Sequence, residues 1–399
     1  MIQNIDNIDF SGKKVLLRVD FNVPLNEQFE VTDDTRLKAA VPTILKIIND
    51  GGRLILMSHL GRPSTEKEAR FSLKHIIPAL SDLLKKPIAF IDNCIGSEVQ
   101  EKVAQLKNGD ILLLENLRYH QEETKGDADF AKELADLADI YINDAFGTAH
   151  RAHASTSVIA NYFDSEHKFF GYLMQREIEA ANKILNHYEK PFTAIIGGAK
   201  VSDKILIIEK LLDKCQNILI GGGMAYTFLK AQDKNIGNSL VENDKLAIAQ
   251  SILKKAKDKG VNFMIPQDSV IADAFSNDAP CKNCSNENIP NDWMGLDIGL
   301  ETIKTYEAVI LSSKTIIWNG PMGVFEMSNF QKGTVSVAKA VAEATKLGAY
   351  SLVGGGDSVA AVNQFNLSEQ VSYISTGGGA MLEYLEGKEL PGIKAILNN

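Results

Sequence analysis

The sequence predicts an α/β protein made of two similar, doubly wound, Rossmann-like lobes with parallel sheets, joined by a helix. Short runs rich in Val, Ile and Leu recur along the chain, five in each half. Each run ends in polar or glycine residues and is followed by a stretch with helical periodicity. Near-continuous apolar strands that alternate with helices are typical of parallel sheets covered on both faces. A length of 399 residues also favours two domains, because single cores rarely grow that large.

The predicted strands follow one another at regular intervals. In the first half the runs, quoted with the residues that follow them, are KVLLRVDFNVP, RLILMSHLGRP, PIAFIDN, ILLLENLRYH and IYINDAFGTAHRAHAS. In the second half they are FTAIIGGAKVSDK, NILIGGGMAY, TIIWNGPMG, YSLVGGGDS and SYISTGGGA. In open parallel sheets ligands bind beyond the carboxyl ends of the strands, so we expect the residues after each run to carry the function.

A helix is expected between the two halves, over residues 171–190. Leu173, Ile178, Ala181 and Leu185 recur at helical spacing, and Pro191 ends the pattern. We therefore predict a first lobe over 1–170 and a second over 191–376. The alternative, a helix inside one continuous domain, would require one sheet of about ten strands, near the upper limit for open sheets.

Composition excludes several classes of protein. With 45% hydrophobic and 23% charged residues the chain resembles a soluble globular protein. The formal net charge of -9 argues against a general nucleic-acid binder. No run approaches 18 uncharged apolar residues and the first residues do not resemble a secretory signal, so we expect a cytoplasmic protein without a membrane partner.

The number and spacing of the cysteines also favour a cytoplasmic protein. Four cysteines in so long a chain do not form a disulfide framework, which is consistent with a reducing compartment. Cys281 and Cys284 have C-x-x-C spacing, but there is no second pair and no nearby histidine. Two incidental cysteines in a polar loop are therefore preferred to a zinc site.

The strand ends of the first half carry charged and polar side chains. They are Asp20, Asn22, His59, Arg62, Arg118, Asp144, His150, Arg151 and His153. One arginine after a strand is usually a surface residue, whereas three of them together with Arg36 favour a pocket for a phosphate or carboxylate. His150 and His153 have no acid or cysteine at useful spacing, so a structural role is preferred to metal binding.

The strand ends of the second half carry glycines. They are Gly197, Gly198, Gly221, Gly222, Gly354, Gly355, Gly356, Gly377, Gly378 and Gly379. Glycines between a strand and a helix expose amides to a phosphate, and their repetition favours close approach of a ligand. Neither G-x-x-x-x-G-K-[ST] nor a strand-linked G-x-G-x-x-G is present, which argues against a nicotinamide-dependent dehydrogenase.

Two features near these glycines have alternative interpretations. Asp357 directly follows glycines at a predicted helix start, where it is either a helix N-cap or a magnesium ligand. Lys200 and Lys204 lie at the start of another predicted helix, where the helix dipole disfavours lysine. They either contact an anion or are two solvated lysines.

Ten segments in register along essentially the whole chain resemble the phosphoglycerate kinase family. They are RVDFNVP, SHLGRP, LLLENLRYH, NDAFGTAHRAHAS, GGAKVSDKI, GGGMAYTFLKA, WMGLDIG, WNGPMGVFE, VGGGDS and STGGGAMLEYLEGKELPG. The resemblance implies two lobes with a deep cleft between them, and a segment over 377–399 that returns to the first lobe. It also implies a monomer that transfers the acyl phosphate of 1,3-bisphosphoglycerate to ADP, with Mg²⁺, giving ATP and 3-phosphoglycerate.

The resemblance implies roles for individual residues. The phosphoglycerate would be held by Asp20, Asn22, Arg36, His59, Arg62, Arg118 and Arg151. The nucleotide would be held by Gly197, Gly198, Lys204, Gly221, Gly222, Gly295, Asn319, Glu326, Gly355, Gly356, Asp357 and Ser358, with Glu326 on the ribose and Asp357 on Mg²⁺. From the chemistry of phosphoryl transfer, we expect Arg36, Lys200 and the amides of Gly356, Gly377, Gly378 and Gly379 to stabilise the transferring phosphoryl group.

The implied chemistry requires no general base, because a carboxylate nucleophile is already ionised at neutral pH. Substrates on opposite lobes would meet by hinge bending near residues 171–191 and Thr376. Two departures from the family pattern are Leu300, where proline is commoner, and the cysteine-bearing segment SNDAPCKNCSNENIP. A non-catalytic, two-lobed anion-binding protein is the alternative that the arginines alone would permit.

Overall fold

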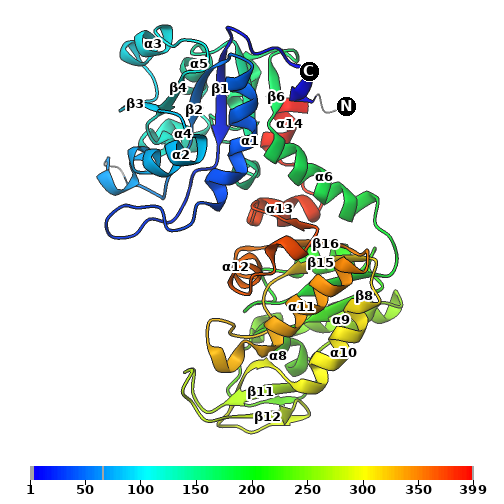
Figure 1. Ribbon diagram of the computed structural model, residues 1–399. Coiled ribbons are helices and arrows are strands. Elements are labelled where there is room, and N and C mark those ends of the chain that lie inside the picture. The colour runs from blue at the N-terminus through cyan, green and yellow to red at the C-terminus, as the bar shows by residue number, and fades with distance from the viewer. Residues whose placement is uncertain (1–3, 65–66, 398–399) are drawn as a thin grey trace. The chain divides into compact units, whose positions relative to one another are not determined.

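The computed structural model describes residues 4–64 and 67–397, which form two compact units (Figure 1). Unit 1 comprises the residues up to Glu179 together with the segment from Lys388 onwards, and unit 2 is Ala180–Gly387. The boundary falls inside helix α6, Tyr172–Asn186. No described helix is long and apolar enough to cross a membrane.

Unit 1 contains a sheet of six parallel strands in the order β3-β4-β2-β1-β5-β6. The strands are β1 Lys14–Val19, β2 Arg53–Met57, β3 Ala89–Ile91, β4 Ile111–Leu114, β5 Ile140–Asp144 and β6 Lys168–Phe170. The five predicted strands are confirmed. The sixth, β6, is three residues long and too short for a periodicity signal.

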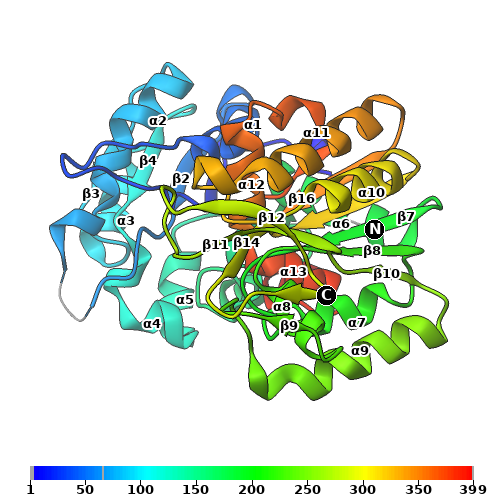
Figure 2. The same ribbon diagram turned by 90° about the horizontal axis from the view of Figure 1, so that it is seen from below.

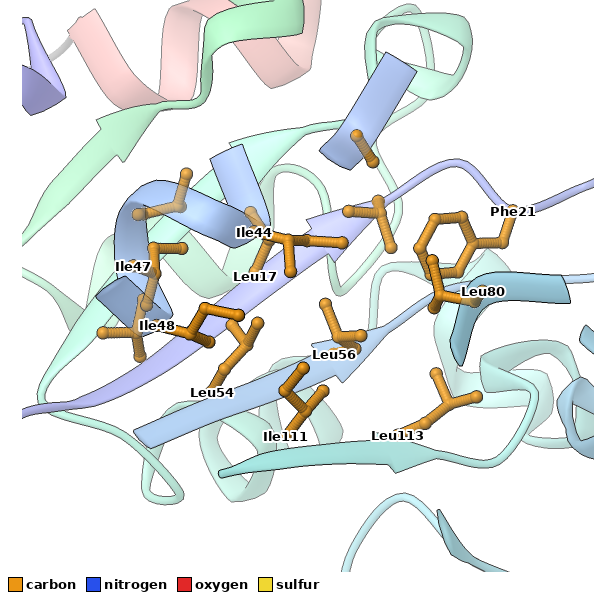
Figure 3. Close-up of a cluster of buried hydrophobic side chains, with 14 of the residues drawn as sticks. Leu17, Phe21, Ile44, Ile47, Ile48, Leu54, Leu56, Leu80, Ile111 and Leu113 are labelled. Carbon is orange, nitrogen blue, oxygen red and sulfur yellow. The ribbon is translucent and has the colours of Figure 1, made fainter. Parts of the chain in front are cut away.

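Helices cover both faces of this sheet. Its helices are α1 Thr35–Asn49, α2 Ile77–Leu84, α3 Ser97–Ala104, α4 Gln121–Lys125, α5 Ala128–Ala135 and α14 Pro391–Leu397. Figure 3 shows Leu17, Leu54 and Leu56 of the sheet packed against Ile44 of α1 and Leu80 of α2. The alternate strand positions pack with α3 and α5 on the other face. Burial on two faces explains why the strands are almost continuously apolar.

Unit 2 contains a second sheet of six parallel strands, in the order β10-β8-β7-β15-β16-β17. The strands are β7 Phe192–Ile196, β8 Asn217–Ile220, β10 Asn262–Met264, β15 Thr315–Asn319, β16 Tyr350–Gly354 and β17 Tyr373–Ile374. Counted along the chain this is the 3-2-1-4-5-6 order of dinucleotide-binding folds. The five predicted strands are present, and β10 is additional.

Helices also cover both faces of the second sheet. They are α7 Ile205–Leu211, α8 Met224–Lys230, α9 Leu246–Asp258, α10 Leu300–Leu311, α11 Lys332–Lys346, α12 Gly356–Gln364 and α13 Gly379–Leu385. Figure 2 shows α10, α11 and α12 on one side of the strands and α7, α8 and α9 on the other. Ile195, Ile316 and Trp318 point to the α10–α11 side, where they form one buried cluster.

Short helical turns complete the described elements. They are the 3-10 helices η1 Ile5–Asn7, η2 Ala69–Phe71, η3 Leu73–Ile76, η4 Leu117–Tyr119, η5 Phe146–Thr148, η6 Val158–Tyr162, η7 Asn243–Lys245, η8 Ser328–Phe330 and η9 Ser368–Gln370.

A smaller β layer in unit 2 was not predicted. Strands β11 Asp268–Ala272, β12 Cys281–Ser285 and β14 Met294–Ile298 form an antiparallel sheet, and β9 Asn235–Ile236 pairs in parallel with β13 Asn288–Ile289. The segment expected as a polar loop therefore contains a strand, β12. Its polar residues carry no apolar pattern, and the strand exists because it pairs with β11. Cys281 is exposed and Cys284 half-buried, and both are free thiols.

The chain leaves unit 2 later than predicted. Helix α13 packs on α7 and belongs to unit 2, so the segment in unit 1 begins at Lys388 and not at 377. Helix α14 packs on β6 and η6, and the Gly392 amide donates to the Ala149 carbonyl at 2.8 Å. The helix predicted over 171–190 is α6, which ends earlier, at Asn186. Near that end Ile184 is fully buried, whereas Leu185, which was predicted at helical spacing, is half-buried.

Candidate active site

The carboxyl edge of the first sheet carries the predicted anion-binding residues. In doubly wound sheets ligands bind where the strand order reverses, which here is between β1 and β5. Asp20 directly follows β1, and His59 follows β2. Arg118 lies in η4 behind β4, and Arg151 lies in the loop behind β5. The sheet therefore brings residues from four strand ends to one edge.

Asp20 is the acidic centre of this edge. Its Oδ2 accepts a hydrogen bond from Nη1 of Arg36 at 2.5 Å, and its Oδ1 lies 4.0 Å from Nδ1 of His59. Asp20 is 8% exposed, whereas the Arg36 side chain is 35% exposed. The ion pair orients the Arg36 guanidinium from the first turn of α1, while part of it stays open to a ligand.

Asn22 and Arg118 hold the loop that follows β2. Asn22 Oδ1 accepts from the Gly61 amide at 2.8 Å, and Arg118 Nη1 donates to the Gly61 carbonyl at 2.7 Å. Arg62 is the next residue along this loop, and its side chain is exposed. Asn22, Arg62 and Arg118 therefore belong to one connected group.

The cations of this group lie close enough to perturb one another. Burial lowers the pKa of Arg118 to about 10, with Arg18 and Arg151 contributing. Burial also brings the pKa of His59 well below its usual range, with Arg18, Arg118 and Arg36 contributing. His59 is therefore neutral at neutral pH. A cluster of unbalanced cations at a strand edge favours an anionic ligand.

A buried network beneath the cluster was not predicted. Arg18 is 1% exposed; its Nε donates to Ser155 Oγ at 2.8 Å, and its Nη2 lies 3.3 Å from His59 Nδ1. Glu123 is fully buried and accepts from the Ser155 amide at 2.9 Å and hydroxyl at 2.7 Å, with Arg18 at 4.0 Å. The arginine inside the apolar run KVLLRV is the sequence signal for this network, because a charge within a buried strand requires partners.

The two histidines assigned to structural roles lie within this region. His153 is 7% exposed, and its Nδ1 is 3.8 Å from Glu123 Oε1. Burial lowers the pKa of His153 to about 4, with Arg18 contributing next. Arg151 Nε donates to His150 Nε2 at 3.2 Å. His153 therefore lies beside the buried Glu123, and His150 contacts Arg151 of the cation cluster.

Unit 2 contains a pocket of about 640 Å³ at the carboxyl edge of its sheet. This volume suits a nucleotide-sized ligand. Five of the predicted nucleotide residues line it, namely Gly198, Gly222, Gly295, Glu326 and Asp357. Its apolar wall was not predicted and includes Leu240, Phe275, Met294, Leu296 and Met322. Leu240 is 51% and Phe275 64% exposed, which leaves two large apolar side chains available to the flat face of a base.

The predicted glycines fall into two groups. A Cβ on Gly197 would lie 2.1 Å from the Pro321 carbonyl oxygen, and one on Gly221 would lie 2.4 Å from Met322 Sδ. At these two positions the chain itself approaches closely, which gives each glycine a packing reason in addition to the predicted ligand contact. At Gly356 and Gly379, which begin α12 and α13, a Cβ would meet nothing within 4 Å. Their amides are open to a ligand.

Lys204, Asn319 and Ser358 connect the strand ends of unit 2. Lys204 Nζ donates to Asn319 Oδ1, and Asn319 Nδ2 donates to the Gly354 carbonyl at 2.9 Å. The Gly320 amide donates to Ser358 Oγ at 2.5 Å. Burial lowers the pKa of Lys204. Helix α7 begins at Ile205, so both predicted lysines precede it, and Lys200 is exposed.

Asp357 is not an N-cap. The N-cap of α12 is Gly355, at φ +88°, and Asp357 lies inside the first turn. Its carboxylate is exposed and accepts no hydrogen bond from any residue that the structure describes. A free carboxylate beside open helix amides fits a hard cation that also binds phosphate oxygens.

The comparisons with known proteins agree over nearly the whole chain. Residues 5–388 match the family model for phosphoglycerate kinase. The phosphoglycerate kinase of Porphyromonas gingivalis is 54% identical, with 98% of this chain and 99% of that protein covered. That of Chloroherpeton thalassium is 52% identical, with 99% of each covered.

Solved structures agree as well. The phosphoglycerate kinase structure from Coxiella burnetii superposes with a TM-score of 0.89 at 41% identity, covering 99% of both chains. That from Pyrococcus horikoshii gives 0.82 at 30% identity, covering 99% of this chain and 98% of that one. Two parallel-sheet α/β units with this sequence similarity define a kinase. The chain belongs to the phosphoglycerate kinase family.

A pH dependence is expected from Asp297, which lines the pocket and is 2% exposed. Its Oδ1 accepts from the Ile298 amide at 2.9 Å and its Oδ2 from the Gly333 amide at 2.7 Å, yet burial raises its pKa to about 7. The folded state therefore holds this proton more tightly than the unfolded state. Its contribution to the free energy of unfolding declines as pH rises from about 4 to about 7.

The substitution Asp297→Asn should flatten this decline by up to about 1.4 kcal/mol per pH unit, because the amide does not titrate. Urea unfolding of both proteins between pH 5 and pH 8 measures it. Parallel curves for the wild type and the variant would contradict the assignment. The exposed acid Asp129 supplies a matched control, since Asp129→Asn should leave the slope unchanged.

Proposed function

We propose that the chain catalyses reversible, Mg²⁺-dependent transfer of the acyl phosphate of 1,3-bisphosphoglycerate to ADP, yielding ATP and 3-phosphoglycerate. Family membership supports the activity, and the cation cluster of unit 1 is the observation that supports the anionic substrate. The test is to mix purified protein, MgADP and 1,3-bisphosphoglycerate and to measure ATP. The alternative, a non-catalytic anion-binding protein, would bind 3-phosphoglycerate without forming ATP.

We assign 3-phosphoglycerate to the carboxyl edge of the first sheet. Arginine forks pair with phosphate and carboxylate oxygens, while Asp20 and Asn22 can bond to a hydroxyl group. The proposed ligands are Asp20, Asn22, Arg36, His59, Arg62, Arg118 and Arg151. Neutral His59 contributes a hydrogen bond without adding charge.

We assign the nucleotide to the pocket of unit 2. The base would contact the apolar wall at Leu240 and Phe275, and Glu326 would bond to the ribose hydroxyls. The phosphates would lie at the open amides that begin α12, near Lys204. The proposed ligands also include Gly197, Gly198, Gly221, Gly222, Gly295, Asn319, Gly355, Gly356 and Ser358. Gly197 and Gly221 in addition allow the close packing of the loop through Pro321 and Met322.

Asp357 is the residue that would hold Mg²⁺ together with phosphate oxygens. When bound, the ion would neutralise charge on the nucleotide phosphates. Lys204 lies near enough to Asp357 for that carboxylate to raise its pKa. Burial lowers the pKa of Lys204, and Asp203, Asp357 and Glu386 partly oppose this effect.

The reaction consists of positioning and charge stabilisation. In the ATP-forming direction an oxygen of the ADP β-phosphate attacks the acyl phosphorus, the bond to the carboxyl oxygen breaks, and 3-phosphoglycerate leaves as a carboxylate. No proton has to move in this step, so no side chain acts as a general base. Arg36, Lys200 and the amides of Gly356 and Gly379 are proposed to stabilise the transferring phosphoryl group.

Replacement of Arg36 tests its catalytic role. Arg36→Ala should lower kcat roughly a thousandfold, the scale of an arginine finger, with the KM for ATP within about twofold. Steady-state kinetics in both directions measure this. The control Arg53→Ala removes an arginine at the opposite end of β2 and should leave kcat unchanged. A turnover above a tenth of the wild type would remove Arg36 from this role.

Replacement of Asp357 tests the metal assignment. Asp357→Ala should raise the KM for MgADP and the Mg²⁺ concentration for half-maximal rate by about tenfold, because the proposed site loses its one carboxylate. The KM for 1,3-bisphosphoglycerate should not change. Glu301→Ala removes an exposed acid from the first turn of α10 and is the control. An unaltered Mg²⁺ dependence would argue against the assignment.

Direct transfer requires the two bound substrates to come within bonding distance. Their proposed ligands belong to different units, so we propose that the units approach during turnover, which would also exclude water from the acyl phosphate. Small-angle X-ray scattering with 3-phosphoglycerate and a non-hydrolysable ATP analogue should show a smaller radius of gyration than either ligand alone. An unchanged radius with both ligands bound would count against closure.

We also propose that the chain acts in the cytoplasm as a monomer, with 3-phosphoglycerate, 1,3-bisphosphoglycerate, ADP and ATP as its partners. The net charge of -9 and the four unpaired cysteines support this proposal. Nucleic acid is not proposed as a partner.

A further inference from the structure

Asn116 is the second residue after β4 and is fully buried. Its amide group makes four hydrogen bonds to the backbone. Oδ1 accepts from the amides of Leu60 at 3.2 Å and Arg118 at 3.0 Å. Nδ2 donates to the carbonyls of Leu60 at 2.7 Å and Phe71 at 2.8 Å. One side chain therefore uses its full capacity to join three separate segments.

These bonds act on two of the loops that carry predicted substrate ligands, those after β2 and β4. Both backbone polar groups of Leu60 bind Asn116, and Leu60 lies between His59 and Arg62 in the loop after β2. The next residue, Gly61, is held by Asn22 and by the Arg118 side chain. Asn116 thus sets the backbone from which His59 and Arg62 project, and it also fixes the amide of Arg118.

The adjacent residue, Glu115, fixes Asn116 in turn. Glu115 is 2% exposed, and its Oε1 accepts from the amides of Leu73 at 2.9 Å and Asn116 at 2.7 Å, while Oε2 accepts from Ser72 Oγ at 2.7 Å. A buried carboxylate with several hydrogen bonds holds its neighbours firmly, because breaking one leaves a charge unsatisfied. The position of Asn116 is therefore fixed through its side chain and, by Glu115, through its backbone amide.

We infer that Asn116 is a positioning residue for the phosphoglycerate site. It sets the spacing between Arg118 and the loop from His59 to Arg62, and it does so without touching the substrate, because it is fully buried. The inference rests on the proposed assignment of 3-phosphoglycerate to this edge. Bidentate arginine contacts depend on geometry, and a displacement of about 1 Å is able to reduce catalysis by about a hundredfold.

The first experiment compares Asn116→Ala with a matched control by steady-state kinetics and isothermal titration. The variant should raise the KM and Kd for 3-phosphoglycerate at least tenfold, with the KM for MgATP within twofold. Thr43 supplies the control: it is fully buried in the same unit, and its hydroxyl accepts from the Tyr172 amide at 3.0 Å. Thr43→Ala should lower the melting temperature as well, yet leave the KM for 3-phosphoglycerate unchanged.

The second experiment uses Asn116→Asp, which keeps the shape of the side chain. An ionised carboxylate cannot donate to the carbonyls of Leu60 and Phe71, but a protonated one restores a donor to one of them. Because position 116 is fully buried, the pKa of the introduced carboxyl should be raised well above its usual range, so that it takes up a proton as pH is lowered from 8 to 6. The ratio of the variant KM for 3-phosphoglycerate to that of the wild type should fall over the same range. Loss of stability by itself would not produce this recovery, and the measurement stands if the alanine variant does not fold.

The outcomes separate the inference from the function on which it rests. A wild-type protein that forms no ATP would contradict the proposed function. An active wild type whose alanine variant keeps its KM for 3-phosphoglycerate within twofold would overturn the positioning role. So would an aspartate variant with a KM ratio independent of pH, or variants in which the KM for MgATP rises equally.

Discussion

The burial of both faces of each parallel sheet is the constraint on which the rest of the structure depends. In β1, Val15 and Leu17 pack against one layer of helices, while Leu16 packs against the other. Polar side chains cannot be placed along such strands without hydrogen-bonding partners, so they gather where the strands end. Since parallel strands end at the same edge, residues distant in sequence become neighbours there. The position of each site follows from this geometry.

The proposed site of unit 1 consists of side chains, and their charges have an electrostatic cost. Several cations close together destabilise one another, and they contribute, after burial, to the lowered pKa of Arg118. Two buried acids, Asp20 and Glu123, offset part of this repulsion and lie beside the arginines that they orient. The remaining positive charge is left for the ligand. Arg18 is almost completely buried, and its charge is tolerated there because Glu123 lies beside it.

The proposed site of unit 2 consists mainly of backbone amides and apolar side chains. Helices α12 and α13 begin at glycines whose surroundings are open, so their first amides are accessible to phosphate oxygens. Gly197 and Gly221 help to form the pocket. Because they lack side chains, the loop through Pro321 and Met322 can pack against the ends of β7 and β8. That loop forms part of the pocket wall. Uncharged backbone amides suit the proposed nucleotide, because a bound Mg²⁺ would already neutralise part of its phosphate charge.

The sequence by itself determined the class of fold and ten of the twelve strands of the two large sheets, and it placed charged side chains at one carboxyl edge and glycines at the other. Apolar runs, glycines and arginines are local signals, and burial on both faces makes them strong. Tertiary structure decided the rest. Strand β12 exists through its partner β11, and Arg18 acquires its role from Glu123. Asn116 acquires its role from Leu60 and Phe71. Each of these depends on a contact between residues that are not neighbours in the chain, and a local pattern does not identify the partner residue.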